Sequence, residues 1–374
     1  MDYGLWGREK NRGKFIKGVD FLSVPVIIKT KNHLREREEL PMVYHTALLD
    51  LRNGCANGDK PLMLRPLLFC PVLTWVCQEL KERGVERFFV ICDEEWRAEA
   101  EAAVRCFDAV VNGDTPDEIL VIDHPVLPAL SSDSSCGLLP LEDAAAVSAA
   151  ATLCRQQALD KLASRGVTVI DPSNTYVDPT CTVGAGTVLL PGTILRGDTH
   201  IGENCEIGPN SMIRDSVIGE GTTVNASQVN ESSVGCHTTV GPFTYVRPNC
   251  TIGDHCRVGD FVEMKNSVIG NGTKISHLTY VGDSDVGQRV NFGCGTVTTN
   301  YDGNKKYRCT IGDDVFLGCN TNLIAPVALG DGSYTAAGST ITQDVPADAL
   351  GIARTRQTNI DGWAARFRKT WKKK

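Results

Sequence analysis

The 374-residue sequence contains no run of 18 apolar residues, so no helix that spans a membrane is predicted. Its opening stretch MDYGLWGREKNRGKF is too charged for the apolar core of a secretory signal, and a cytoplasmic protein is therefore expected. No two of the 15 cysteines have the CxxC spacing of zinc and redox sites, and we expect reduced thiols. The formal net charge of -7 leaves no basic surplus and argues against a general nucleic-acid-binding protein.

What the second half of the chain does contain is an aliphatic residue at every sixth position, usually followed by glycine or proline. A period of 6 fits neither a helical turn of about 3.6 residues nor the alternation of a strand, so a fixed unit of short strand and corner must repeat. Three such positions make one coil of 18 residues, and the pattern predicts a parallel β-helix of eight or nine coils. The expected inward positions are Val177, Val183, Leu189, Leu195, Ile201, Ile207, Ile213, Val234, Val240, Val246, Ile252, Val258, Met264, Ile269, Ile275, Ile311, Leu317, Leu323, Leu329, Thr335 and Ile341.

The first half alternates predicted strands and helices. Residues 1–41 have no clear period and are left as an unassigned extension, with Met42 as an alternative start. Residues 42–138 are predicted to form a small Rossmann-like α/β domain with a parallel sheet: strand 43–51, helix 71–83, strand ERFFVIC, helix EEWRAEAEAAVRC and strand DEILVID. A loop through residues 131–137 and an alanine-rich linker helix over 139–166 follow, and the β-helix is expected over 167–345.

One polar interruption breaks the six-residue count between Thr298 and Ile311, in the 13-residue stretch TNYDGNKKYRCTI. A rigid solenoid must extrude such an insertion as a loop, and loops on solenoids commonly carry binding residues. This one brings together amide, phenol and cationic side chains, so we expect a binding loop.

Several segments go beyond the generic repeat: GPFTYVRP, FVEMKNSVIG, KISHLTYVGDSDVG, VNFGCGTVTTNYDGNKK and GCNTNLIAPV. From about Leu141 to Gln357 the chain closely resembles the acetyltransferase half of the bacterial bifunctional N-acetylglucosamine-1-phosphate uridyltransferase / glucosamine-1-phosphate acetyltransferase family. The resemblance implies a left-handed β-helix and a homotrimer with active sites between neighbouring prisms. It also implies transfer of acetyl from acetyl-CoA to glucosamine 1-phosphate, which supplies UDP-N-acetylglucosamine for peptidoglycan and lipopolysaccharide.

The resemblance assigns site residues by position. His277 matches the catalytic base, and an imidazole can accept a proton near neutral pH; a neighbouring Asn300 or backbone carbonyl is expected to fix its tautomer, whereas His200, His237 and His255 are interpreted as structural. The positions that contact the sugar phosphate are Arg247, Lys265, Tyr280, Asn291 and Lys306. The positions that contact acetyl-CoA are Cys294, Asn300, Tyr301, Cys319, Ala337 and Arg354.

The front domain departs from the family. The stretch ALLDLRNGCANGDKPLMLR keeps Gly54 and Gly58 but lacks the compact glycine-rich phosphate loop, and Leu62 stands where a lysine is expected. Asp123 matches the aspartate that holds Mg²⁺. The domain is interpreted as a reduced nucleotidyltransferase remnant, which makes uridylyl transfer improbable.

Four alternatives remain open. They are a bifunctional enzyme that retains uridylyl transfer, an acetyltransferase for another amino sugar, a non-catalytic trimeric scaffold that binds sugar nucleotides, and a zinc β-helix of the carbonic-anhydrase kind. The last needs three histidines on one site, and the histidines here do not share a coil position.

The C-terminal tail, residues 346–374, is locally basic. From Arg354 onward it holds eight Lys or Arg against Asp361, with Trp363, Phe367 and Trp371 spaced for one helical face. An amphipathic helix docked on its own protein is favoured over membrane or RNA contact.

Overall fold

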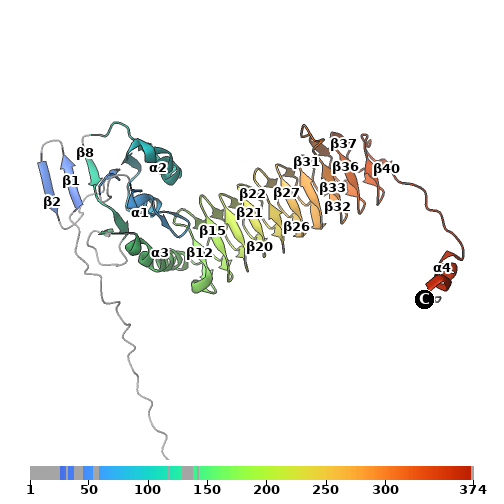
Figure 1. Cartoon of the computed structure of the whole chain (residues 1–374), viewed down its shortest axis with the longest axis horizontal. Coiled ribbons are helices and arrows are strands. Elements are labelled where there is room, and N and C mark those ends of the chain that lie inside the picture. The colour runs from blue at the N-terminus through green and yellow to red at the C-terminus, as the bar shows by residue number, and fades with distance from the viewer. Residues whose placement is uncertain are drawn as a thin grey trace, which may run out of the picture. The chain divides into compact units, whose positions relative to one another are not determined.

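The computed structural model describes residues 26–30, 33–37, 45–53, 59–116, 118–128, 138–140 and 143–371. The chain divides into two compact units (Figure 1). The first is the N-terminal α/β unit up to Ala151, and the second runs from Thr152 and includes Leu68–Cys70. Two predicted features, the glycines at 54 and 58 and the loop through 131–137, lie outside the described residues, as do residues 1–25 of the extension.

The α/β unit is built on a six-stranded sheet with the order β2-β1-β8-β3-β6-β7. Its strands are β1 (Val26–Thr30), β2 (His33–Arg37), β3 (Thr46–Asp50), β6 (Arg87–Ile91), β7 (Asp108–Val111) and β8 (Glu118–Ile122). The helices are α1 (Val72–Glu82) and α2 (Arg97–Val104). The short elements are η1 (Leu62–Leu64), β4 (Pro66–Leu67), β5 (Cys70–Pro71), η2 (Glu94–Trp96), β9 (Val126–Pro128) and β10 (Leu138–Pro140).

The predicted strands and helices of this unit are present, but the sheet is mixed rather than parallel. β3 pairs in parallel with β6 and β8, and β6 with β7, whereas β1 pairs antiparallel with both β2 and β8. Two strands of the extension, β1 and β2, therefore belong to the sheet. These strands were not predicted from the sequence: the charges of β2, in HLRER, hide any alternation, and β1 is a short run, VIIKT, next to it. Strand β7 was not predicted either, because its four residues follow closely on α2.

The linker helix α3 spans Ala144–Ser164, inside the predicted range 139–166, while residues 139 and 140 belong to β10. Its last turns carry Leu159 and Leu162, which are buried in the same apolar cluster as the first coils of the β-helix. The helix thus caps one end of the solenoid, as an end with an exposed apolar core requires.

The second unit is a left-handed parallel β-helix with three sheets, one on each side of a triangular column. The eleven-stranded face consists of β11 (Thr168–Val169), β14 (Val188–Leu189), β17 (Glu206–Ile207), β20 (Thr223–Val224), β23 (Thr239–Val240), β26 (Arg257–Asp260), β29 (Lys274–His277), β32 (Asn291–Phe292), β35 (Phe316–Leu317), β38 (Tyr334–Thr335) and β40 (Leu350–Gly351). The ten-stranded face consists of β12 (Tyr176–Val177), β15 (Ile194–Arg196), β18 (Met212–Arg214), β21 (Gln228–Asn230), β24 (Tyr245–Val246), β27 (Glu263–Lys265), β30 (Tyr280–Gly282), β33 (Val297–Thr299), β36 (Asn322–Ile324) and β39 (Thr340–Ile341). The nine-stranded face consists of β13 (Thr182–Val183), β16 (His200–Ile201), β19 (Val217–Ile218), β22 (Ser233–Val234), β25 (Thr251–Ile252), β28 (Val268–Ile269), β31 (Ser284–Val286), β34 (Cys309–Ile311) and β37 (Val327–Leu329).

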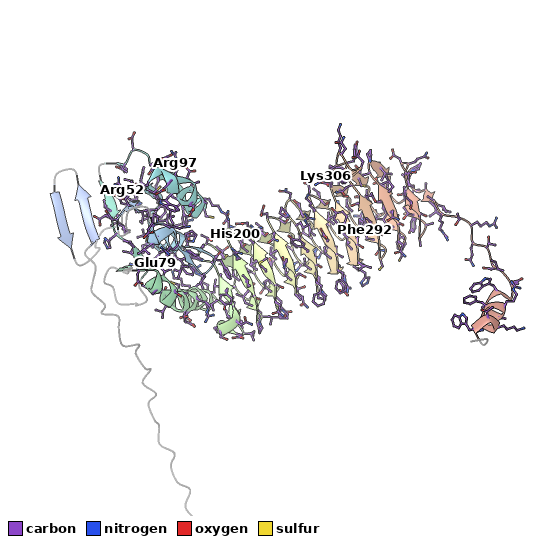
Figure 2. All side chains as sticks on the ribbon, in the orientation of Figure 1. Arg52, Glu79, Arg97, His200, Phe292 and Lys306 are labelled. Carbon is purple, nitrogen blue, oxygen red and sulfur yellow. The ribbon has the colours of Figure 1, made fainter. Side chains whose placement is uncertain are left out.

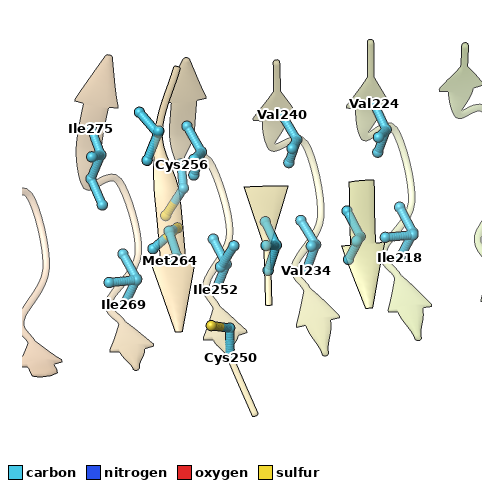
Figure 3. Packing of buried hydrophobic residues seen from close by; sticks show 14 of the residues in the cluster. Ile218, Val224, Val234, Val240, Cys250, Ile252, Cys256, Met264, Ile269 and Ile275 are labelled. Carbon is cyan, nitrogen blue, oxygen red and sulfur yellow. The ribbon is translucent and has the colours of Figure 1, made fainter. Parts of the chain in front are cut away.

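The inward aliphatic residues stack on one another from coil to coil (Figure 3). Every inward position predicted from the period is buried, from fully enclosed Val240 to Val183, which is 7% exposed. Full burial of such a side chain stabilises by about 1.5–3 kcal/mol, so the stacked residues contribute strongly to the stability of the β-helix. The predicted number of coils is too low, because the faces hold nine to eleven strands.

The undercount has a physical cause. Several sides contain five residues instead of six, as between Ile213 and Ile218 and between Val224 and Val229, so a strict count of six loses the inward position there. The solenoid also continues past residue 345 as far as β40.

Within the first coil of the β-helix lies η3 (Pro172–Asn174), and after the last coil α4 (Trp363–Trp371) forms in the tail. The aromatic side chains of α4 contact one another, with ring centroids of Trp363 and Phe367 4.7 Å apart, but none of its residues is buried. The docked position favoured from the sequence is therefore not seen in the single chain. No described helix is both long and apolar enough to cross a membrane.

Candidate functional site

The candidate site lies at the two edges of the ten-stranded face. At one edge, His277, Cys294, Cys319 and Ala337 occupy equivalent places, each two residues after the inward residue of β29, β32, β35 and β38. We call this set the imidazole column. Neighbouring parallel strands lie about 4.8 Å apart, so each member stands one coil from the next. His277 and both cysteines are exposed, and within the described part of the chain the imidazole of His277 has no hydrogen-bond partner.

At the other edge, three cations converge into what we call the cation corner. Val246 pairs with Met264, which sets Arg247 beside Lys265 on the next coil. The ammonium of Lys306 lies so close to Lys265 that it lowers the pKa of Lys265, and Arg247 adds to this effect. Like charges repel unless an anion lies between them, so this arrangement suits a phosphate.

Two further side chains shape the cation corner. Arg247 Nη1 donates to Glu263 Oε1 at 2.8 Å, which orients the guanidinium along the face. Tyr280 lies close enough to Arg247 to raise the pKa of Arg247. The Tyr280 phenol extends over Gly282, where a Cβ would collide with the Tyr280 hydroxyl oxygen. Gly282, which pairs with Lys265, therefore leaves the space that the phenol occupies.

The predicted loop is present between β33 and β34 as a small hairpin. An antiparallel bridge joins Tyr301 and Lys306, and Asp302 Oδ1 accepts from the backbone N–H of Asn304 and Lys305 at 2.7 and 2.6 Å. Figure 2 shows Lys306 on this projection from the column. The insertion is thus a defined turn that delivers a lysine to the cation corner.

Two carboxylates hold the base of the loop. Asp283, only 5% exposed, accepts from Asn266 Nδ2 at 2.5 Å and from Asn300 Nδ2. Arg308 binds Asp285 through two nitrogens, and this ion pair lowers the pKa of Asp285. Asn300 therefore anchors the loop to Asp283 rather than fixing the tautomer of His277, which corrects that alternative.

The remaining predicted residues lie elsewhere. Asn291 begins β32 and lies on the eleven-stranded face, away from Tyr280. Tyr301 donates its hydroxyl proton to the carbonyl of Gly303 at 2.7 Å within the loop. The Arg354 side chain passes Gly338, the residue after Ala337, so it lies at the far end of the imidazole column.

In the α/β unit, Asp123 Oδ1 lies 3.1 Å from His124 Nδ1. Among the residues that the structure describes, no group of three His, Cys, Asp or Glu could hold a metal ion. Because Mg²⁺ is commonly held by only one or two carboxylates together with substrate phosphates, Asp123 as a Mg²⁺ ligand stays a prediction.

Sequence reasoning missed Asp283, Glu263 and Arg308. Asp283 resembles the many Asn and Asp residues that occupy left-handed corners, with φ of 47°, and so gives no signal of its own. The useful signal was spacing: Asn266, Asp283 and Asn300 are each 17 residues apart, which is one coil in this region.

The chain matches the family model described as bacterial transferase hexapeptide (six repeats) at residues 180–215, 231–266 and 308–343. It is 53% identical over 217 residues to the bifunctional protein GlmU of Caldanaerobacter subterraneus subsp. tengcongensis, covering 58% of this chain and 48% of that protein. It is 49% identical over 228 residues to the bifunctional protein GlmU of Halalkalibacterium halodurans, covering 61% and 50%.

Among solved structures, the UDP-N-acetylglucosamine acyltransferase of Arabidopsis is similar with a TM-score of 0.31 and 18% identity, covering 54% of this chain and 75% of that chain. The chain spans about half the length of the curated relatives it matches. In its C-terminal part the chain is thus similar to the bifunctional GlmU proteins, as the sequence motifs predicted.

Proposed function

We propose that the protein is a cytoplasmic acetyltransferase that moves acetyl from acetyl-CoA to the amine of glucosamine 1-phosphate. The observation that carries this proposal is the cation corner, where Arg247, Lys265 and Lys306 meet at one edge of a face whose other edge presents His277. A sugar phosphate that lies across this face has its anionic end at the cations and its amine toward the imidazole.

The chemistry needs a proton acceptor and a path for the thioester. His277 takes the proton as the amine attacks the thioester carbonyl, the C–N bond forms, and the C–S bond breaks to release CoA. The small members of the imidazole column, Cys294, Cys319 and Ala337, leave room for the pantetheine arm, and Arg354 beyond them meets a phosphate. The product is N-acetylglucosamine 1-phosphate, which leads to UDP-N-acetylglucosamine.

The proposal includes a homotrimer. The imidazole column and the cation corner occupy the two edges of one face, and Asn291 and Tyr301 lie off it, so one chain alone leaves the groups that would hold acetyl-CoA and sugar on an open surface. A neighbouring column set against this face would cover it and exclude water from the reacting groups.

The test is CoA release measured with a thiol reagent on the full-length protein. His277→Ala is expected to remove activity while the oligomeric state and thermal unfolding stay unchanged. His200→Ala is the matched control, because His200 is also exposed but lies on a distant coil with Asp198 and Thr182 as partners. Near-normal turnover in His277→Ala would contradict the proposal.

The cation corner also determines which amino sugar we expect as the substrate. Removing the guanidinium with Arg247→Ala is expected to raise KM for glucosamine 1-phosphate far more than KM for acetyl-CoA, since the cations contact only the sugar phosphate. Turnover of unphosphorylated glucosamine at a comparable kcat/KM would favour another amino sugar as the substrate.

For uridylyl transfer, the described part of the α/β unit offers no support. Asp123 Oδ1 lies 3.1 Å from His124 Nδ1, and among the described residues no group of three His, Cys, Asp or Glu could hold a metal ion. Pyrophosphate release from UTP, assayed on the same preparation as acetyl transfer, is expected to be absent, and its appearance at a rate matching CoA release would establish the bifunctional alternative.

A further inference from the structure

Two cysteines of the imidazole column share a feature that acetyl transfer does not use. Cys294 and Cys319 are the exposed cysteines among those the structure describes, and both are free. The strands before them pair in register, Phe292 with Leu317, and the Asn320 backbone N–H donates to the Cys294 carbonyl at 2.8 Å. The two cysteines therefore stand opposite each other on neighbouring coils.

The spacing suits a disulfide. Parallel neighbours have strands about 4.8 Å apart, and disulfides join Cα atoms about 4.4–6.8 Å apart. The coils approach closely here, since a Cβ on Gly293 would lie 2.5 Å from the Cys319 backbone nitrogen. On the far side of Cys319 stands Ala337, whose small side chain leaves the sulfur free to turn toward Cys294.

The other described cysteines lack this combination. Cys250 and Cys256, which are close in sequence, are buried and occupy different faces of the column. Burial raises the pKa of both thiols, which makes them poor nucleophiles.

We propose that Cys294 and Cys319 are a redox-modification site in which a low-molecular-weight disulfide converts the two thiols into a disulfide between neighbouring coils. Cys294 stands one coil from His277, so the imidazole of His277 is the neighbouring group that can accept the proton of the Cys294 thiol. Cys294 is therefore the attacking thiol and Cys319 the resolving one.

The exchange balances without any further reactant. The Cys294 thiolate attacks one sulfur of the small disulfide, which forms a mixed disulfide and expels one small thiolate. The Cys319 thiolate then attacks the Cys294 sulfur, forms the protein disulfide and expels the second small thiolate. The protein loses two protons and two electrons, and the small disulfide is reduced to two thiols.

The consequence for activity rests on the proposed function. The new bond replaces two free thiols with a bridge on the path assigned to the pantetheine arm, so the oxidised protein is expected to lose acetyl transfer and to regain it on reduction. Oxidation of the thiols themselves does not depend on that assignment.

The experiment incubates the native full-length protein with glutathione disulfide and maps the tryptic peptides without reduction. The expected product links the peptide of Cys294 to the peptide of Cys319. Cys309 shares that second peptide but is buried, so Cys309→Ser is expected to retain the link. In Cys319→Ser, glutathione is expected to remain on Cys294, whereas Cys294→Ser is expected to leave Cys319 much less modified.

Acetyl transfer is measured on the same samples before and after dithiothreitol, each variant being compared with its own reduced form. Loss of activity in proportion to the linked fraction, with recovery on reduction, supports the proposal. Unmodified thiols, a persistent mixed disulfide in the unmutated chain, or a link between two chains overturns the proposal. A full link with unchanged activity overturns its consequence for activity, namely that the bridge blocks the path assigned to the pantetheine arm. A reduced protein without any acetyl transfer counts against the proposed function, while the peptide map still decides whether the thiols pair.

Discussion

The carboxylate of Asp283 offers the sharpest test of how the binding loop is held. It is buried and accepts from the side-chain amides of Asn266 and Asn300, so Asp283→Ala leaves both amides without an acceptor. A hydrogen bond to a charged group contributes about 1.5–3 kcal/mol, and an unsatisfied buried donor costs about 1–3 kcal/mol. Because Asn266 and Asn300 are only partly buried, water can replace some of this, and we expect the loop to lose about 2 kcal/mol of local stability.

Hydrogen exchange measures that loss where it occurs. The Tyr307 backbone N–H donates to the Asn300 carbonyl at 2.8 Å and closes the hairpin. A loss of about 2 kcal/mol raises the open fraction about 30-fold, so the Tyr307 amide is expected to exchange about 30-fold faster. The β-helix core should keep its protection, since each coil contacts only its neighbours.

Asp313→Ala is the matched control. Its carboxylate likewise accepts a hydrogen bond across a corner, but from the backbone N–H of Gln288 at 2.8 Å, and that corner lies away from the loop. Unchanged exchange at Tyr307 in Asp283→Ala, or equal acceleration in Asp313→Ala, would refute the reasoning.

Three further predictions concern Tyr280, Lys265 and the C-terminal helix α4. Gly282→Ala is expected to displace the Tyr280 phenol and to raise KM for glucosamine 1-phosphate with little change in thermal unfolding; an unchanged KM would contradict the packing argument. The pKa of Lys265 is lowered mainly by Lys306, so Lys265 loses its charge at a lower pH than an isolated lysine does. Phosphate binding weakens when that charge is lost, and KM for glucosamine 1-phosphate is expected to rise in the same pH range. In a profile of KM against pH, Lys306→Ala is expected to move the rise in KM to higher pH, because the pKa of Lys265 is no longer lowered by Lys306. A move to lower pH would contradict this prediction. Truncation after Asp361 removes α4, which buries nothing, so the melting temperature should stay within about 1 °C, and a larger fall would indicate that the tail docks.

The fold of the second unit was predictable because its signal is local and repeated. A single aliphatic residue per side, with a small or turn-forming residue after it, recurs often enough that occasional errors do not hide the period. The five-residue side from Ile213 to Ile218 shows the limit: it preserves the inward position in space but shifts the count in sequence, and the number of coils came out too low.

The α/β unit was less predictable because its pairing is not local. The β1–β2 hairpin, Val26–Thr30 and His33–Arg37, joins the sheet through β8, about 90 residues later in the chain. The sequence of the hairpin contains no signal that identifies β8 as its partner, so the antiparallel edge of the sheet was not predicted.

Taken alone, the amino-acid sequence determined the β-helix, its inward residues, the position of the extruded loop and the similarity of the C-terminal part to the bifunctional GlmU proteins, because a period or a motif along the chain specifies each of them. Only the tertiary structure decided which residues meet. Coil register, which depends on the exact length of every side, brought Arg247, Lys265 and Lys306 to one edge, buried Asp283 beneath the loop, and set Cys294 opposite Cys319.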